Sequence, residues 1–125
     1  MANILVIDDE EGVRQVVAKV LEREGHKVTE ASDGKVALSL MRDAHPDLVV
    51  CDLFMPEMDG VEVLRKLRRD HPQLSVVAIS GGGYQGQVQL LDVAKKLGAV
   101  AVLKKPFELS ELVGAVNLAL GVEDE

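Results

Sequence analysis

The sequence has almost no aromatic side chains: two Phe, one Tyr and no Trp in 125 residues. A hydrophobic core must therefore be built from aliphatic residues, and nearly half of the chain is apolar. This length suits one domain with a single core. The scarcity of aromatic rings argues against a platform on which the bases of single-stranded nucleic acid would stack.

The chain also lacks a net positive charge, a second cysteine for a disulfide and long apolar runs. Its net charge of −7 argues against duplex DNA or an anionic membrane as a direct partner. The single cysteine, Cys51, excludes an internal disulfide, and we expect it to be buried in a strand. There is no basic, apolar leader at the start of the chain and no apolar run near the ~18 residues of a membrane span. We therefore expect a cytoplasmic protein.

Four uninterrupted apolar runs dominate the pattern that is present. Such runs are typical of strands in a parallel sheet that is covered on both faces. They are Ile4–Ile7, Leu48–Cys51, Val76–Ile79 and Val100–Leu103. The segment Lys27–Ala31 instead alternates polar and apolar residues, which indicates a half-exposed edge strand. Helical spacing of apolar residues follows each strand, so the sequence predicts a (βα)5 α/β fold. We expect a doubly wound parallel sheet in the order 2-1-3-4-5.

Polar residues stand at or just after the carboxyl ends of the apolar runs. They are Asp8, Asp9, Asp52, Ser80 and Lys105. Ligands of open α/β sheets bind in the crevice beyond these strand ends, so the fold would gather these five residues at one point. Each residue alone has a simpler interpretation: a helix cap for Asp8 or Asp9, a turn residue for Ser80, a solvated lysine for Lys105. Their convergence favours a site.

Three carboxylates in one crevice repel one another. Two unit charges ~4 Å apart at an effective dielectric constant of ~20 cost about 4 kcal/mol. A hard divalent cation such as Mg²⁺ relieves this repulsion and prefers to bind beside a phosphate. Lys105 and the Ser80 hydroxyl could then contact a phosphoryl group, and Asp52 could act as a nucleophile that forms an acyl phosphate.

Essentially the whole chain resembles the receiver domain of two-component response regulators, of the stand-alone kind typified by the chemotaxis regulator, with its flavodoxin-like fold. The motifs that carry this resemblance are Asp8-Asp9, the segment Asp52–Gly60, Ser80 and Lys105-Pro106-Phe107. We expect residues 1–121 to form the receiver domain and residues 122–125 an acidic tail.

The resemblance implies a role for each site residue. Asp52 would accept a phosphoryl group from a phosphohistidine on a histidine kinase or phosphotransfer protein. Mg²⁺ would be bound by Asp9, Asp52 and the backbone carbonyl of Phe54, with Asp8 acting through a water molecule. Lys105 would pair with the phosphoryl group before a cis bond to Pro106, and Ser80 would be the switch hydroxyl. Such a domain is a signalling module that assists only its own phosphorylation and dephosphorylation, not an enzyme.

Two departures from the family pattern concern how the signal is transmitted. Val102 stands where the family often has an aromatic residue in the fifth strand, and Gly81-Gly82-Gly83 follows Ser80. We therefore expect phosphorylation to reorganise residues 80–84 more than the fifth strand, and Gly82 to leave the phosphoryl group open to water.

A downstream protein would bind the face formed by the fourth helix, the fifth strand and the fifth helix. Candidate contacts there are Leu90, Val93, Val102 and Ala115, each of which is as readily explained as a core residue. The resemblance is compatible with a monomer or with a weak, phosphorylation-dependent dimer.

Other classes remain open at this stage. An aspartyl-phosphate phosphatase would need a second Asp two residues after Asp52, where this chain has Phe54. A flavin binder would need a phosphate-binding first loop, which the run Asp8–Glu11 would repel. The chain could also be a receiver cut from a longer regulator with a DNA-binding or enzymatic output, although Met1 and the short acidic tail favour a free-standing protein.

Overall fold

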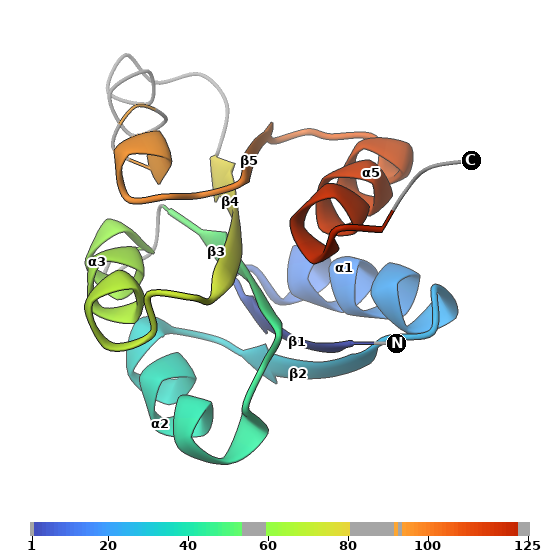
Figure 1. The fold of residues 1–125 in the computed structure, drawn as a ribbon. Coiled ribbons are helices and arrows are strands. Elements are labelled where there is room, and N and C mark those ends of the chain that lie inside the picture. Colours follow the sequence, from blue (N-terminus) through green and yellow to red (C-terminus); the bar gives the residue numbers. More distant parts are fainter. Residues whose placement is uncertain (1, 54–59, 81–91, 93, 123–125) are drawn as a thin grey trace.

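The computed structural model describes residues 2–53, 60–80, 92 and 94–122. Strands and helices alternate along the chain (Figure 1). The strands are β1 (Asn3–Ile7), β2 (Lys27–Ala31), β3 (Leu48–Asp52), β4 (Ser75–Ser80) and β5 (Ala101–Lys104). The helices are α1 (Glu11–Arg23), α2 (Gly34–Ala44), α3 (Gly60–Asp70) and α5 (Leu109–Leu120). Of residues 85–97, where the apolar spacing indicates a helix, Asp92 and residues 94–97 are described; Asp92 and residues 94–96 are helical, and Leu97 lies in a turn.

The five strands form one parallel sheet in the order β2-β1-β3-β4-β5, which confirms the predicted fold. β3 lies in the centre, and all five of its residues are buried. β2 is an edge strand with the half-exposed pattern that its alternating sequence predicts. β5, at the other edge, begins one residue later than its apolar run, because Val100 is exposed.

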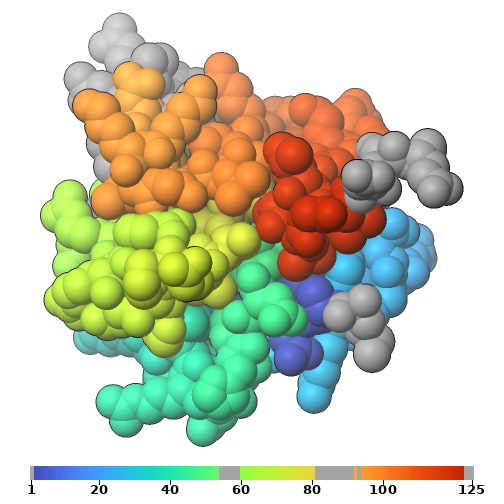
Figure 2. Space-filling model, in the orientation of Figure 1, coloured from blue at the N-terminus to red at the C-terminus, as the bar shows by residue number. Residues whose placement is uncertain are grey.

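Alternate residues of each strand pack against opposite layers of helices. Leu5 and Ile7 face the layer of α2 and α3, whereas Ile4 and Val6 face the layer of α1 and α5. Figure 1 shows the two pairs of helices on opposite sides of the sheet, and in Figure 2 the atoms of α2, α3 and α5 make up much of the visible surface. This double cover explains why the runs Ile4–Ile7, Leu48–Cys51 and Val76–Ile79 of the central strands are apolar without interruption.

The helix ends follow local sequence signals. The side chain of Asp33 accepts a hydrogen bond of 2.9 Å from the amide of Val36 and so caps α2. Glu108 and Glu111 form a reciprocal capping box at the start of α5. Gly25 and Gly98 have φ values of +93° and +88°, which glycine adopts without a Cβ clash and which are typical of the residue that ends a helix.

The connections on either side of the β1–β3 pair leave toward opposite faces. α1, which follows β1, packs in the same core cluster as α5, and α3, which follows β3, packs with α2. The crevice of a doubly wound sheet opens at this point. The fold thus places the end of β1 beside the end of β3, where the sequence has its carboxylates.

Candidate phosphoacceptor site

The carboxyl ends of β1, β3, β4 and β5 carry four of the five polar residues that the sequence predicts for the site. Asp52 and Ser80 are the last residues of β3 and β4, while Asp8 and Lys105 directly follow β1 and β5. Asp8, Asp52 and Ser80 are the three buried polar residues of the described chain, with 1–2% of their surface exposed. Burial of ionisable groups is costly, so these carboxylates require a cation close by.

Lys105 supplies that cation. Its Nζ lies 3.1 Å from Oδ2 of Asp52, 3.2 Å from Oδ2 of Asp8 and 2.9 Å from Oε1 of Glu10. One ammonium group therefore faces three carboxylates. The surplus negative charge leaves this end of the sheet suited to a further cation.

The carboxylates also act on Lys105. Burial by itself lowers the pKa of the ammonium group. The hydrogen bond to Glu10 and the negative charges of Asp52 and Asp8 outweigh this effect, and the pKa is raised above its usual value. Lys105 is therefore a permanent positive charge at neutral pH.

Main-chain contacts hold the strand ends in register. The amide of Lys105 donates to the carbonyl of Ser80 at 2.7 Å, and the amide of Leu53 donates to the carbonyl of Ile79 at 2.8 Å. These bonds extend the pairing of β3, β4 and β5 beyond the last paired residues. They fix the Cα positions from which Asp52 and Lys105 project.

Gly60 brings α3 directly against the end of β3. Its amide donates to the carbonyl of Leu53 at 3.1 Å, and a Cβ at this position would overlap the backbone of Asp52 and Leu53. Only glycine permits this approach. The first residue of α3 thus supports the main chain that carries Asp52.

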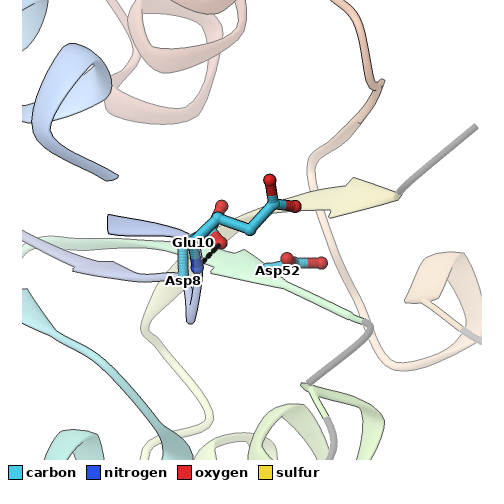
Figure 3. A group of neighbouring side chains, drawn as sticks. All are labelled: Asp8, Glu10 and Asp52. Carbon is cyan, nitrogen blue, oxygen red and sulfur yellow. Dashed lines mark hydrogen bonds between the residues drawn. The ribbon is translucent and has the colours of Figure 1, made fainter. Parts of the chain in front are cut away.

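The loop between β1 and α1 orients Asp8. The amide of Asp8 donates to the carbonyl of Ala31 at 3.2 Å, and its Oδ1 accepts a hydrogen bond of 2.9 Å from the amide of Glu10. Figure 3 shows Asp8 and Glu10 side by side, with Asp52 opposite them. Glu10 directly precedes α1 as its N-cap residue and makes no side-chain cap hydrogen bond, so its carboxylate is available to the site.

One oxygen of the site lacks a hydrogen bond. Oδ2 of Asp8 is buried and accepts no hydrogen bond from the described residues, although it lies within ion-pair distance of Lys105. The ligand oxygens of Asp8, Glu10 and Asp52 all lie within 4.8 Å of one another. Carboxylate oxygens are the donors that Mg²⁺ prefers, and a buried oxygen without a hydrogen bond is suited to a metal or to its water shell. The residues present thus fit a magnesium ion.

The structure differs from the sequence-based expectation in which acidic residues after β1 reach the site. Asp9 is exposed and is not among the three carboxylates that converge, whereas Glu10, which the sequence analysis did not select, is one of them. A signal for Glu10 was present, because the acidic run continues through Glu10 and Glu11. Phe54 lies outside the described residues.

The residues expected to transmit the signal are only partly described. Ala115 is buried in the core between the sheet and α5, so its assignment to a partner surface is wrong. Val102 is half-buried and packs against the opposite core cluster. Leu90, Val93 and the segment Gly81–Tyr84 lie outside the described residues. Cys51 is buried as expected, and the bond between Lys105 and Pro106 is cis.

Comparison with known proteins agrees with this fold and site. Residues 4–117 match the response regulator receiver domain family. The chain therefore belongs to this family and is a receiver domain of two-component signalling.

The similarity extends to proteins of different length. Sporulation initiation phosphotransferase F of Bacillus subtilis (strain 168) is 32% identical, and the match covers 91% of this chain and 90% of that protein. Regulatory protein AtoC of Escherichia coli (strain K12) is 34% identical over 96% of this chain, but the chain spans only 25% of that protein. The crystal structure of the receiver domain of NtrX from Brucella abortus is 35% identical, with a TM-score of 0.87 and coverage of 96% of this chain and 99% of that one.

Proposed function

We propose that Asp52 is the phosphoacceptor of this receiver domain. The proposal rests on the position of the Asp52 carboxylate. It is buried at the end of the central strand, lies 3.1 Å from the Lys105 ammonium and is grouped with Asp8 and Glu10. An oxygen of Asp52 would attack the phosphorus of a phosphohistidine. The P–O bond forms as the P–N bond breaks, and the imidazole keeps the electron pair.

A bound Mg²⁺ would neutralise charge on the transferring phosphoryl group. Asp8, whose buried Oδ2 accepts no hydrogen bond from the described residues, and Asp52 would hold the ion directly or through water. On the family resemblance, Asp9 and the backbone carbonyl of Phe54 would complete the ligand set. Asp9 adjoins Asp8 in the loop after β1.

Lys105 and Ser80 would contact the phosphoryl group once it is on Asp52. The Lys105 ammonium already points at Asp52, and its raised pKa keeps it charged throughout the reaction. Ser80 ends the neighbouring strand β4, and its carbonyl is bonded to the amide of Lys105. Movement of either residue would therefore displace the other, which suits the switch role of Ser80.

The protein that donates the phosphoryl group would dock on a groove beside the site. This groove, of about 970 Å³, lies between α1 and the segment that leads into α5, and Glu10 and Lys105 form part of its wall. Val16 and Leu109 line it and are 50% and 48% exposed. Exposed apolar residues contiguous with an acceptor site suit an apolar helix face of a histidine kinase or phosphotransfer protein.

We further propose a cytoplasmic, non-enzymatic role in which a downstream protein reads the face of β5 and α5. Val100 and Leu118 are exposed apolar residues of this region. No helix among the described residues is long and apolar enough to cross a membrane.

Two measurements test these assignments separately. Treatment with Mg²⁺ and a small phosphodonor, followed by peptide mapping, should place a hydroxylamine-labile phosphoryl group on Asp52; a stable or differently placed phosphoryl group would refute the acceptor assignment. For the groove, Val16→Ser and Leu109→Ser should slow transfer from the most active member of a panel of autophosphorylated histidine kinases but not from the small donor. Val36→Ser, at a valine on α2 that is 40% exposed and lies outside the groove, is the control.

A further inference from the structure

Arg14 connects the acidic loop to the edge strand of the sheet. It lies in the first turns of α1, and only 14% of its side chain is exposed. The guanidinium group points back toward the end of β1, where Nη1 donates a hydrogen bond of 2.9 Å to the carbonyl of Asp8. Its Nε donates a bond of 3.1 Å to Oε1 of Glu30 on β2. The Arg14–Glu30 pair therefore spans from the edge strand to the residue that carries the buried carboxylate.

The contact with Asp8 completes a set of restraints on this one residue. The amide of Asp8 is bonded to Ala31, Oδ1 is bonded to the amide of Glu10, and the carbonyl is bonded to Arg14. The carbonyl of Glu10 in turn accepts from the amide of Arg14 at 2.9 Å. With the main chain held on these sides and Oδ1 bonded to the amide of Glu10, Oδ2 of Asp8 lies 3.2 Å from Nζ of Lys105 in the site.

The ion pair of Glu30 contributes little to the free energy of unfolding. Its side chain is 40% exposed, and a surface ion pair of this kind contributes about 0–1 kcal/mol. Glu30 matters more for the geometry of Arg14, because its carboxylate at Nε fixes the plane of the guanidinium group. With that plane fixed, Nη1 remains directed at the carbonyl of Asp8.

We propose that Arg14 and Glu30 are positioning residues for the cation site. They form a brace, the Arg14–Glu30 brace, that holds the β1–α1 loop so that the carboxylates of Asp8 and Glu10 face Asp52. The brace thereby sets the affinity of the site for Mg²⁺. This inference rests on the proposed function, since it assigns residues outside the site a part in metal binding at that site.

Removal of Arg14 should change the Mg²⁺ affinity in the opposite direction from the one that charge alone predicts. Arg14 is a positive charge near three carboxylates, so its removal should strengthen Mg²⁺ binding if only charge matters. Loss of the brace should instead weaken binding, because the carboxylate oxygens are no longer held in place. Mutation of residues that orient metal ligands typically costs 10–100-fold in affinity. We expect about tenfold for Arg14→Met, since Arg14 acts on the main chain of Asp8 and not on its carboxylate.

The test is a double-mutant cycle measured by Mg²⁺ titration of amide NMR shifts in the full chain. Arg14→Met and Glu30→Ala should each weaken binding, and the double variant should be no weaker than Arg14→Met alone. Arg14→Lys, which can reach only one of the two partners, should restore part of the affinity. Arg23→Met, the same charge change at the exposed end of α1, should leave affinity unchanged. In the absence of metal, the amide of Asp8 should exchange faster in the two brace variants than in the wild type.

Two outcomes refute the brace and leave the proposed function standing, and a third refutes both. If the wild type binds Mg²⁺ but Arg14→Met binds it equally or more tightly, the brace is refuted and the phosphoacceptor proposal stands. Additive losses in the double variant would also refute the brace, because they would show that the two residues act independently. If the wild type does not bind Mg²⁺ at all, both proposals fail together.

Discussion

Nζ of Lys105 lies 3.1 Å from Oδ2 of Asp52, although 53 residues separate them along the chain. The two residues project from the ends of β5 and β3, which are not neighbours in the sheet, and β4 lies between them. Their contact therefore depends on the order of the strands and on the length of the Lys105 side chain. It is the link between the fold and the chemistry of the site.

Loss of the Lys105 charge should destabilise the metal-free protein. Lys105→Met leaves three carboxylates without their shared cation, and we expect the free energy of unfolding to fall by about 2–3 kcal/mol. This is below the 3–5 kcal/mol of a fully buried pair, because 15% of the lysine side chain is exposed. Urea denaturation measures the loss. Lys104→Met, at the exposed neighbouring lysine, is the control, and an equal effect of the two substitutions would contradict this account.

Glu10 should slow the phosphorylation of Asp52 by anionic phosphodonors. Glu10→Gln removes one of the three negative charges around Lys105, and a unit charge at ~4 Å in water is worth about 1 kcal/mol. At saturating Mg²⁺, phosphorylation by a small anionic phosphodonor should therefore become about fivefold faster. The rate follows from intact mass against time. Glu11→Gln, one residue later and outside the cluster, should react at the wild-type rate, and the hypothesis fails if Glu10→Gln does too.

Two glycines in helices should respond oppositely to alanine. Gly60→Ala places a Cβ against the backbone of Asp52 and Leu53, and we expect a loss of stability of about 3 kcal/mol with slower phosphorylation. Gly114→Ala in α5 has open space around the new Cβ and should stabilise the protein by about 0.5–1 kcal/mol. Thermal unfolding and phosphorylation rates of both variants check the comparison. Similar effects would show that Gly60 is not confined as the structure indicates.

Arg68 should stabilise the connection between α3 and β5. Its Nε and Nη2 donate to the carbonyls of Leu97 and Gly98 at 2.7 and 3.1 Å, and Nη1 donates to that of Pro72 at 2.8 Å. Arg68→Met leaves these carbonyls without a donor and should cost about 2 kcal/mol in urea denaturation. Arg65→Met, on an exposed arginine of the same helix, should cost less than 0.5 kcal/mol. A small loss at Arg68 would mean that water replaces the guanidinium group.

The fold and the centre of the site could be predicted because they depend on patterns that are local in the sequence. The apolar runs Ile4–Ile7 and Leu48–Cys51 identify buried strands, and the alternation in Lys27–Ala31 identifies an edge strand. Strand order then brings Asp8 and Asp52 together. Positions at strand ends are thus readable from the sequence once the topology is assumed.

Contacts made by long side chains could not be predicted in this way. Glu10 and Lys105 are 95 residues apart, and their contact depends on the rotamers of two flexible side chains. Arg14 and Glu30 are indistinguishable in sequence from ordinary surface charges. Val16 has the same helical spacing as the buried residue Leu21 and its neighbour Val20 on α1, yet it is half exposed, because it lines the groove next to α5 rather than the core.

The most direct test of the central claim is the intact mass of the protein after incubation with Mg²⁺ and a small phosphodonor. We expect the wild type to gain one phosphoryl group. We expect no gain when a chelator removes Mg²⁺, and none in Asp52→Asn, which keeps the shape of the side chain but not its charge. A phosphoryl group on Asp52→Asn, or a wild-type protein that is never modified by the small donor or by any phosphorylated kinase, would contradict the assignment of Asp52 as the phosphoacceptor.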